Sequence, residues 1–501
     1  MLQEIKYLIK NDRKLQIILF IGLLVQIIFS VTNNGFHHPD QHFQIIEFSS
    51  YQLGKPTGAG HVWEMTNFVR PTLQVFLFSA YSIVCDLVTI NDPYTQLTIL
   101  RVFLGIVMFV TFNVIAVYYF KNSQAVILYA VLCILNFSWC LPYTRTLFSS
   151  EILSSLFFFG ALFLYDFKKY KSSSIFFLIC IGFLFSISFY LRFQMASALL
   201  GFGIWILFFE KKYQNILPLI VGFTLGIGIN VYLDYLFYNE LIFTPYSYFY
   251  ANINAGRAAE FGTSSFLFYV GVFLLTITIP PFSFVLFYYG IKAFFKKYDH
   301  ILVLPVVFFI AAHLMIGHKE DRFLFPILNI LPIIVGFVLP DLIGYIKTGK
   351  KWITYSIKII LFISIFLNTA LLMLLAIIPY SQTVHFSYKL KKQFKMEEVA
   401  VYCLPRTPWE TESGTPMIFY QKGIGNIKLK KIFNKDSIRY LGNAHFIAAT
   451  FNDLKTEKPM LDSLGYKPIL YSSKLLWSIN EFLTTKKINS LNDIWILYKK
   501  D

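Results

Sequence analysis

Charged residues and paired cysteines are scarce in this sequence, and each absence excludes a kind of protein. Asp, Glu, Lys and Arg make up only 14% of the 501 residues, whereas roughly a quarter is usual in globular proteins. Four of the five cysteines lie inside apolar runs, and none has the spacing of a zinc or redox motif. The chain also lacks the alternating ~10-residue segments of an outer-membrane barrel. An ordinary soluble protein, a cysteine-based centre and a β-barrel are therefore excluded.

Hydrophobic residues are correspondingly abundant. They form 56% of the chain, aromatic residues form 19%, and the mean hydropathy is +0.58. Apolar runs of roughly 17 to 25 residues match the ~20 residues that a helix needs to cross a bilayer. We therefore predict an all-α polytopic membrane protein with about 11 to 12 transmembrane or re-entrant helices. The candidate segments are about 15–31, 71–90, 99–120, 124–141, 150–166, 174–190, 195–209, 216–239, 266–290, 301–317, 323–345 and 353–379.

Lysine clusters between the apolar runs predict the orientation of the chain. A net charge of +16 would suggest a nucleic-acid partner for a soluble protein, but clusters in this position are typical of cytoplasmic loops, so no nucleic acid is expected. Keeping all clusters on one side requires one segment not to cross. We predict that 71–90, which starts at Pro71 and carries Asp86, is re-entrant or in-plane. The clusters are Lys6 to Lys14, Lys168 to Lys171, Lys211 and Lys212, Lys292 to Lys297, and Lys347 to Lys351.

With the N-terminus inside, this arrangement places the C-terminus outside. The tail is less apolar, and short strand-like pieces alternate in it with helix-like polar stretches, which indicates a small α/β domain. We predict a membrane domain over 1–382, with a catalytic first outer loop at 32–70, and a soluble extracytoplasmic domain over 383–501. The strand-like pieces are 417–420, 445–450, 468–471 and 493–498.

The first outer loop carries the sequence HHPDQ at residues 37–41. Pro39 and Asp40 fit the first turn of a helix, where proline is tolerated and an acid is stabilised by the helix dipole. The functional alternative is that Asp40 acts as a general base, with His38 beside it in the substrate site. His37 and His38 are consecutive, which is poor spacing for metal ligands on a helix. No metal and no cofactor is therefore expected.

Further along this loop, Glu47 lies two helical turns after Asp40, on the same predicted face. Trp63, Glu64 and Arg70 then bring an aromatic ring, a carboxylate and a guanidinium together. This set suits stacking on a sugar and hydrogen bonding to it, and suits an aromatic membrane anchor equally well.

The densest charge cluster of the membrane part is HKEDRF at residues 318–323. His318, Lys319, Glu320 and Arg322 form either a phosphate site, in which Arg322 binds bidentately and Lys319 as a point charge, or a knot of salt bridges. Single charges at predicted helix ends, which usually extend toward the membrane surface, become candidates when taken together with this cluster. They are Arg145, Glu151 and Arg192.

These motifs resemble, in order and in spacing, those of the eukaryotic α-mannosyltransferase family of N-glycan and GPI-anchor assembly. The resemblance covers essentially the whole chain, and its tail is most similar to the branch that adds the third mannose of GPI anchors. It implies the GT-C fold and a polyprenyl-phosphate mannose donor. The motifs are HHPDQHFQIIEF, GHVWEM, FVRP, TRTLFSSE, DYLFYNELIFTP and HKEDRFLFP.

The resemblance also implies roles for particular residues. Asp40 would be the general base, Glu47 and Glu64 would shape the acceptor and sugar site, and the donor phosphate would face His318, Lys319 and Arg322. Two positions depart from the family pattern. Gln41 replaces an acidic residue, so a second carboxylate beside Asp40 is not implied, and Met65 replaces an aromatic residue.

The resulting hypothesis is an inverting transfer of mannose to a lipid-linked or exported glycan, carried out among membrane lipids. Abundant Lys, Asn, Ile and Phe suggest a bacterial source, which would place the protein in the inner membrane with a periplasmic site; a eukaryotic source implies the endoplasmic reticulum with a lumenal site. The alternatives are a different polyprenyl-phosphate sugar, or a lipid-linked saccharide flippase. A transporter would instead place its ionisable residues near the middle of the membrane.

Overall fold

The computed structural model is mostly helical and forms two compact units. The first unit comprises residues 1–31, 67–74 and 100–376, and the second comprises 32–66, 75–99 and 377–501. This division follows packing within the chain; the predicted boundary at residue 382 between membrane and soluble parts stays a prediction. Within these units the structure describes residues 2–168, 174–260, 262–276, 278–395, 397–433, 438, 445–454, 457–486 and 494–500.

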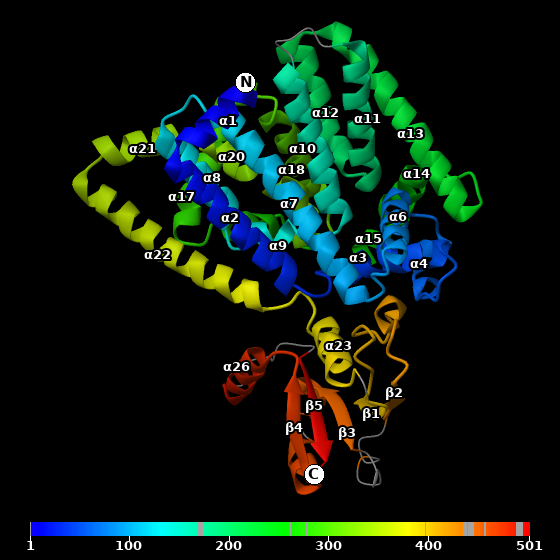
Figure 1. Ribbon diagram of the computed structural model, residues 1–501. Helices are drawn as coiled ribbons and strands as arrows, with labels where there is room; N and C mark the ends of the chain where they lie inside the picture. The colour runs from blue at the N-terminus through cyan, green and yellow to red at the C-terminus, as the bar shows by residue number, and fades with distance from the viewer. Residues whose placement is uncertain are drawn as a thin grey trace. The chain divides into compact units, whose positions relative to one another are not determined.

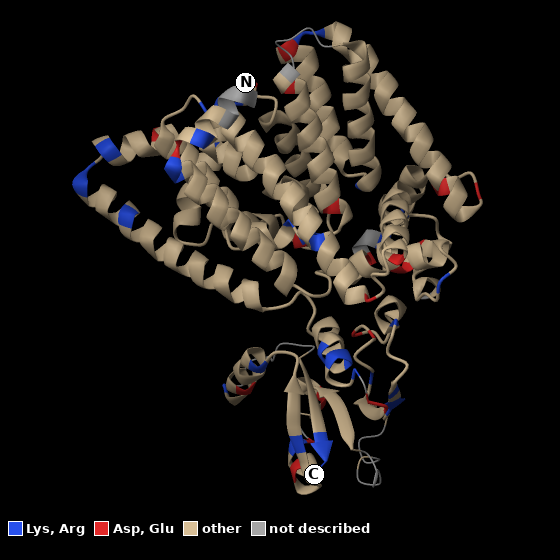
Figure 2. Cartoon of the chain, in the orientation of Figure 1, with Lys and Arg blue, Asp and Glu red and all other residues tan. Residues whose placement is uncertain are grey.

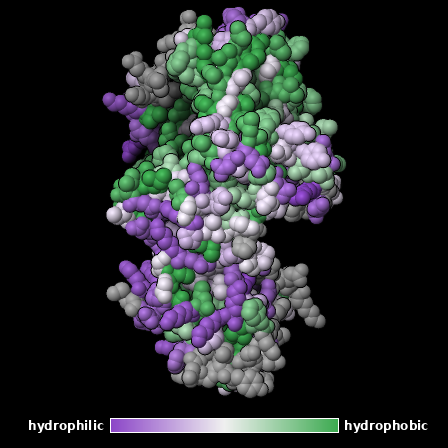
Figure 3. Space-filling model, turned by 90° about the vertical axis from the view of Figure 1, so that its right-hand side faces the viewer, coloured by the Kyte–Doolittle hydropathy of each residue, from purple (hydrophilic) through white to green (hydrophobic). Residues whose placement is uncertain are grey.

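Apolar helices dominate the first unit, as the sequence predicted. Among the described residues, five helices are long and apolar enough to cross a membrane. Their surfaces carry large exposed apolar side chains such as Leu217 and Leu225, and the helical part of the face in Figure 3 is largely hydrophobic. The five are α2 (Arg13–Thr32), α7 (Pro93–Phe120), α10 (Ser150–Lys168), α13 (Ile216–Tyr238) and α22 (Lys351–Ile377).

Shorter helices and turns complete this unit. Lysines and arginines colour the turn between α21 (Leu339–Thr348) and α22 and the region near the N-terminus (Figure 2). The predicted cluster members Lys169 and Lys171 lie outside the described residues. The other elements are α1 (Leu2–Asn11), α8 (Ala125–Phe137), α9 (Leu141–Thr144), α11 (Ile175–Leu191), α12 (Met195–Trp205), η3 (Ile206–Glu210), η4 (Tyr213–Asn215), α14 (Thr244–Phe249), η5 (Tyr250–Asn254), α15 (Arg257–Glu260) and α18 (Val303–Met315).

Helices α11 and α13 run side by side (Figure 1) and touch through small residues. A Cβ added at Gly222 would lie 1.9 Å from the Ile179 carbonyl oxygen, and one at Gly182 would lie 2.1 Å from that of Leu219. Gly226, one turn after Gly222, similarly faces Ser186. Only small residues allow backbones to approach this closely, as in membrane helix pairs with small residues four apart.

Two predicted continuous segments are wrong, because prolines break them. Segment 266–290 is divided at Pro280 and Pro281, and segment 323–345 contains three further prolines. Proline lacks the backbone N–H of the helical ladder, and its ring clashes with the preceding turn. The resulting pieces are α16 (Leu267–Thr276), α17 (Phe282–Lys296), η6 (Asp321–Leu324), α19 (Phe325–Leu328), α20 (Leu331–Gly336) and α21 (Leu339–Thr348).

The second unit begins with the first loop, where α3, η1 and α4 follow one another without a break, so that Asp40 and Glu47 lie on one helical stretch with a π-helix in its middle. Segment 71–90 forms α6 (Leu73–Leu87), whose 15 residues are fewer than the ~20 of a full span; its re-entrant placement stays a prediction. The elements of the loop are α3 (Pro39–Gln41), η1 (His42–Glu47), α4 (Phe48–Gln52), η2 (Ala59–His61) and α5 (Trp63–Thr66).

The tail in this unit has the predicted mixed α/β character. Its strands form one sheet in the order β2-β1-β3-β5-β4 (Figure 1), parallel among β2, β1 and β3 and antiparallel around β5. The predicted strand at 417–420 is wrong, because Ile418–Gln421 is a 3-10 turn, η7. The strands are β1 (Val399–Leu404), β2 (Ile427–Lys431), β3 (Phe446–Thr450), β4 (Tyr466–Tyr471) and β5 (Trp495–Lys500).

Helices cover both faces of this sheet. Successive residues of a strand point to opposite faces, and on β5 the Trp495 ring stacks on Phe386 of α23, with centroids 5.6 Å apart, while Ile496 joins the buried cluster that contains Trp477 of α26. Both edges carry features that disfavour pairing: β2 is rich in lysine, and β4 has Pro468 and an irregular register. The helices are α23 (Gln382–Gln393), α24 (Phe451–Leu454), α25 (Lys458–Ser463) and α26 (Lys474–Thr485).

Candidate functional site

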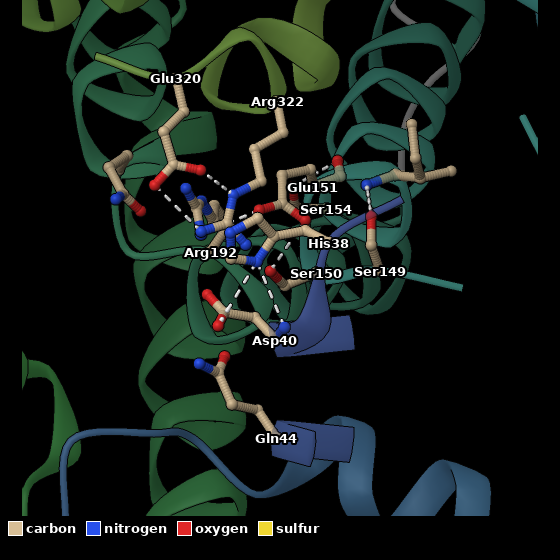
Figure 4. A network of polar contacts seen from close by, with 12 residues as sticks. His38, Asp40, Gln44, Ser149, Ser150, Glu151, Ser154, Arg192, Glu320 and Arg322 are labelled. Carbon is tan, nitrogen blue, oxygen red and sulfur yellow. Dashed lines mark hydrogen bonds and ion pairs between the residues drawn. The ribbon is translucent and has the colours of Figure 1, made fainter. Parts of the chain in front are cut away.

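In the first unit, His318 and Arg322 of HKEDRF both contact the carboxylate of Glu320, and Figure 4 shows the contact with Arg322. The Glu320 carboxylate accepts from Nε of Arg322 and, at 3.1 Å, from its Nη2, while His318 Nε2 lies 2.9 Å from Oε1. The guanidinium of Arg322 therefore makes a bidentate contact with a single carboxylate, that of Glu320. Such two-point contacts fix the plane of the guanidinium as well as its position.

His318 ties this cluster to the loop before α16. Its Nδ1 lies 2.8 Å from the carbonyl oxygen of Gly262, and Ser264 N donates to Gly317 O at 3.0 Å. Both partners of the ring, a carbonyl and the Glu320 carboxylate, are acceptors. These two contacts fix the orientation of the His318 ring.

Lys319 is buried beside this cluster. Its ammonium donates to the carbonyl oxygens of Leu314 and Ile316 and lies 5.4 Å from the ring centroid of Tyr269. The carbonyl groups and the ring hold the charge in place near Arg322 without neutralising it.

Arg192 and Glu151 form a buried pair from distant parts of the sequence (Figure 4). Arg192 Nη1 lies 3.0 Å from Glu151 Oε1, the carboxylate sits in the first turn of α10, and the guanidinium lies 5.0 Å from the Phe323 ring centroid. Arg192 is only 6% exposed, and its Nε and Nη2 have no hydrogen-bond partner among the described residues. Because buried donors without partners are costly, these two are poised to receive an oxygen ligand.

Arg145, also a predicted substrate residue, is fully buried. It donates to three neutral acceptors: Nε to Asn329 Oδ1 at 2.7 Å, Nη2 to Leu135 O at 2.6 Å and Nη1 to Asn136 Oδ1 at 3.3 Å. The guanidinium thus fastens the end of α8 to the residue that follows α19. A substrate contact would have to displace these bonds, so the geometry gives Arg145 a structural role in this unit.

Asp40 and His38 lie in the second unit, at the start of α3. His38 is the N-cap, and its Nδ1 accepts from Asp40 N at 3.2 Å and lies 3.4 Å from Asp40 Oδ1 (Figure 4). Pro39 occupies the first helical turn, as the helix-start interpretation predicted. The Asp40 side chain is 25% exposed. The helix start therefore leaves this carboxylate accessible to a substrate.

Glu47 is the centre of a closed network in the second unit. Its oxygens accept from His42 Nε2 at 2.9 Å, Gly58 N at 2.8 Å, Thr57 Oγ1 at 3.1 Å and Phe419 N at 3.0 Å, and its side chain is fully buried. Burial alone would raise the pKa of Glu47, but the bond and charge of His42, with the backbone donors, hold that pKa below its ordinary value. Glu47 thus joins the first loop to the tail, and any contact with substrate would be through the residues it holds.

The remaining predicted residues also divide between the units. Glu64 of α5 is buried and accepts from Gln44 Nε2 at 2.9 Å, and Trp63 beside it is half-buried. Arg70 belongs to the first unit, where its guanidinium lies 5.7 Å from the ring centroid of Tyr248. Tyr248 was not among the predicted site residues; its signal in the sequence is its place in an aromatic run between two predicted spans.

His42 was missed as well. Its ring stacks between Phe36, at 5.5 Å, and Tyr420, at 5.1 Å between centroids. The available signal was its spacing of five residues before Glu47, which only the wider turn of a π-helix brings together.

Apolar membrane helices followed by a small C-terminal sheet domain define the fold of the GT-C glycosyltransferases. The fold resembles that of ArnT from Cupriavidus metallidurans bound to undecaprenyl phosphate, with a TM-score of 0.51 at 9% identity over 96% of this chain and 97% of that one. The apo form of ArnT gives a TM-score of 0.52 at 10% identity, over 91% and 95% of the two chains.

The chain belongs to the Alg9-like mannosyltransferase family, whose model matches residues 17–402. It is thus an integral, multi-pass membrane protein with the GT-C fold. GPI mannosyltransferase 3 of Candida albicans is 31% identical over 140 residues, and that of Debaryomyces hansenii 28% over 133 residues. These matches span 28% and 26% of this chain but only 26% and 23% of the relatives, so they cover about a quarter of each protein.

Proposed function

We propose that this chain transfers mannose from a polyprenyl-phosphate donor to a lipid-linked or exported glycan, with inversion at the anomeric carbon. The observation that carries the proposal is the buried guanidinium of Arg192. Two of its donors have no hydrogen-bond partner in the described part of the chain, and it lies beside an arginine held by Glu320 and a buried lysine. Convergent buried cations suit the phosphate of a lipid donor. The family and the undecaprenyl phosphate named for ArnT support mannose and a polyprenyl phosphate.

An apolar cavity beside these cations suits the lipid chain of the donor. It measures about 180 Å³ and is bounded by α16, α17, α18 and α20. Tyr269 lines the cavity and also lies under the Lys319 ammonium. A phosphate bound at the cations would therefore have an apolar path for its isoprenoid tail within the same unit.

The chemistry requires a base for the acceptor and a stabilised leaving group. An acceptor hydroxyl attacks C1 of mannose from the face opposite the phosphate, the C1–O bond to phosphate breaks, and its electron pair goes to the phosphate oxygen. Asp40 takes the hydroxyl proton, while Arg192, Lys319 and Arg322 stabilise the charge that develops on the phosphate.

A transfer assay tests this proposal. Purified protein with radiolabelled polyprenyl-phosphate mannose and a panel of glycan acceptors should form labelled product, and Asp40→Asn should lower kcat by about 100-fold or more, as expected for a general base, while donor binding is retained. Glu398→Gln is the matched control, because its side chain is 81% exposed in the tail. An unchanged rate in Asp40→Asn would remove Asp40 from the mechanism.

We also propose that the site and the tail face away from the cytoplasm. Lysine clusters between spans support this side, since positively charged loops stay in the cytoplasm. A cysteine added after residue 501 should react with a membrane-impermeant thiol reagent that is applied from the extracytoplasmic side. Labelling from the cytoplasm alone would reverse the assignment.

A further inference from the structure

The motif DYLFYNELIFTP, residues 234–245, covers the end of α13 and the loop after it. No residue of this motif belongs to the proposed phosphate site or acts as the proposed base. Its first residue, Asp234, is fully buried. Asp234 Oδ1 accepts from Thr72 N at 2.9 Å and from Thr72 Oγ1 at 2.8 Å, and Oδ2 accepts from Thr244 Oγ1 at 2.6 Å. One carboxylate therefore fastens two loops that are far apart in sequence to the end of one membrane helix.

Tyr238, one turn after Asp234, holds the same loop at a second point. Its hydroxyl donates to the carbonyl oxygen of Arg70 at 2.8 Å, and its ring packs edge-on against Phe68, with centroids 5.1 Å apart. Residues four apart share one face of a helix. The last turns of α13 thus fix the backbone on both sides of Pro71, and with it the direction in which the Arg70 side chain leaves the chain.

The second loop fixed by Asp234 carries the aromatic partner of Arg70. Thr244 opens α14, and Tyr248 lies one turn later on the same helix. The Tyr248 ring lies 5.7 Å from the Arg70 guanidinium, and its hydroxyl accepts from Gln194 Nε2 at 2.7 Å. Gln194 follows Arg192 by two residues, so Tyr248 links Arg70 to the segment that carries the phosphate-binding arginine.

A carboxylate in an apolar membrane helix is expensive to bury and is kept where it serves a function. Hydrophobic packing could join a helix to two loops at less cost, but it would not fix a backbone N–H and two hydroxyls at defined angles. Hydrogen bonds to a charged acceptor do fix them, and they are stronger than neutral ones.

We propose that Asp234 is a positioning residue for the donor: by holding Thr72 and Thr244 it sets Arg70 against Tyr248, so that Arg70 reaches the donor phosphate beside Arg192. This inference rests on the proposed function of the site. Asp234 itself touches neither donor nor acceptor. Its loss therefore acts on donor affinity, and leaves the chemical step intact once donor is bound.

Paired substitutions distinguish two effects of Asp234: the position of the loops that it holds and the charge of its carboxylate. Asp234→Asn keeps one oxygen for Thr72 and offers its amide to the Thr244 hydroxyl, which can rotate to accept, so the loops stay in place. Asp234→Leu removes every bond. Thr72→Val removes one hydroxyl without changing side-chain shape, and Thr72→Ser restores it. Tyr235→Phe, at a 45% exposed position of the same helix, is the control.

The main readout is the KM for polyprenyl-phosphate mannose, measured separately from the acceptor KM and from kcat. Asp234→Leu and Thr72→Val should raise the donor KM about tenfold, the effect of one lost contact to a charged group, with acceptor KM and kcat within about twofold. Asp234→Asn, Thr72→Ser and Tyr235→Phe should match the wild type. An unchanged donor KM in folded Asp234→Leu or Thr72→Val overturns the inference, as does an equal rise in both KM values. The inference is also overturned if Asp234→Asn raises the donor KM as much as Asp234→Leu does. In that case the charge of Asp234, and not the position of the loops that it holds, would determine donor affinity.

Hydrogen exchange separates this inference from the proposed function. Amides of residues 68–74 and 244–249 should exchange faster in Asp234→Leu than in Asp234→Asn, whether or not any donor is used. Equal protection in the two variants overturns the positioning role. Slow exchange in Asp234→Asn combined with no transfer by the wild type from any donor would instead refute the proposed function alone.

Discussion

Replacing Glu47 tests how the first loop is joined to the tail within the second unit. Glu47→Gln has nearly the same shape but only one oxygen. In either orientation its amide NH₂ faces a backbone N–H, either that of Gly58 or that of Phe419, because each carboxylate oxygen now accepts from one of them. One buried donor is therefore left unsatisfied.

The magnitude follows from this count. A buried backbone N–H without a partner costs about 1–3 kcal/mol, so Glu47→Gln should lower the free energy of unfolding of the second unit by that amount. Glu47→Ala leaves both N–H groups and the partners His42 and Thr57 without the carboxylate, and its loss should be about twice as large or more.

Thermal unfolding in detergent, with hydrogen exchange of residues 417–421, measures the effect. The pH dependence gives a second check. Because the folded-state pKa of Glu47 is below its ordinary value of 4.5, its contribution is fully present above that value and is lost as pH falls through the lower folded pKa. Glu47→Gln should lose this acid-side dependence. Wild-type stability and exchange in Glu47→Ala, with Glu398→Gln as control, would refute the assigned network.

Three further predictions concern packing, titration and the lipid cavity. Gly222→Val should prevent recovery of folded protein, because its Cβ would lie 1.9 Å from Ile179 O, whereas Gly228→Ala, with nothing within 4 Å, should behave normally; equal yields would contradict this. Burial, aided by a nearby lysine, lowers the pKa of His385 from 6.5 to about 4, so its neutral form stabilises the fold above pH 6.5 and that contribution falls toward pH 4. A calorimetric series should show this slope in the wild type and not in His385→Gln. Gly290→Leu, which fills the cavity, should raise the KM of a long-chain donor roughly tenfold, or about 1.4 kcal/mol, without affecting a short-chain one; an equal effect on both would exclude the cavity as the tail site.

Sequence patterns predicted the apolar helices well, because length and hydropathy determine them with little help from tertiary contacts. They failed where local chemistry overrides hydropathy. Pro280 and Pro281 break an apolar run that reads as one span, and residues 417–420 look strand-like but fold as a 3-10 turn. Strand β2 was missed because three of its five residues are lysine, which is atypical of a strand until its edge position is known.

The local part of the site was predictable, and the long-range part was not. His318, Glu320 and Arg322 are neighbours in sequence, so their mutual contacts follow from the motif. The pairing of Arg192 with Glu151 depends on how two helices pack, which no spacing reveals. Arg145 was predicted to bind substrate because its neutral hydrogen-bond partners come from separate segments of the chain, and the sequence alone does not show that they contact it.

The two edges of the tail sheet limit how this domain can meet other molecules. Lys428, Lys430 and Lys431 line the outer strand on one side, and Pro468 with its irregular register interrupts the other, within the part of the sheet that the structure describes. A strand from another polypeptide would meet charge repulsion at the first edge and a missing N–H donor at the second. The sheet edges of neighbouring copies in the same bilayer are thereby kept from pairing with one another. A partner of this domain must bind through its loops or helices.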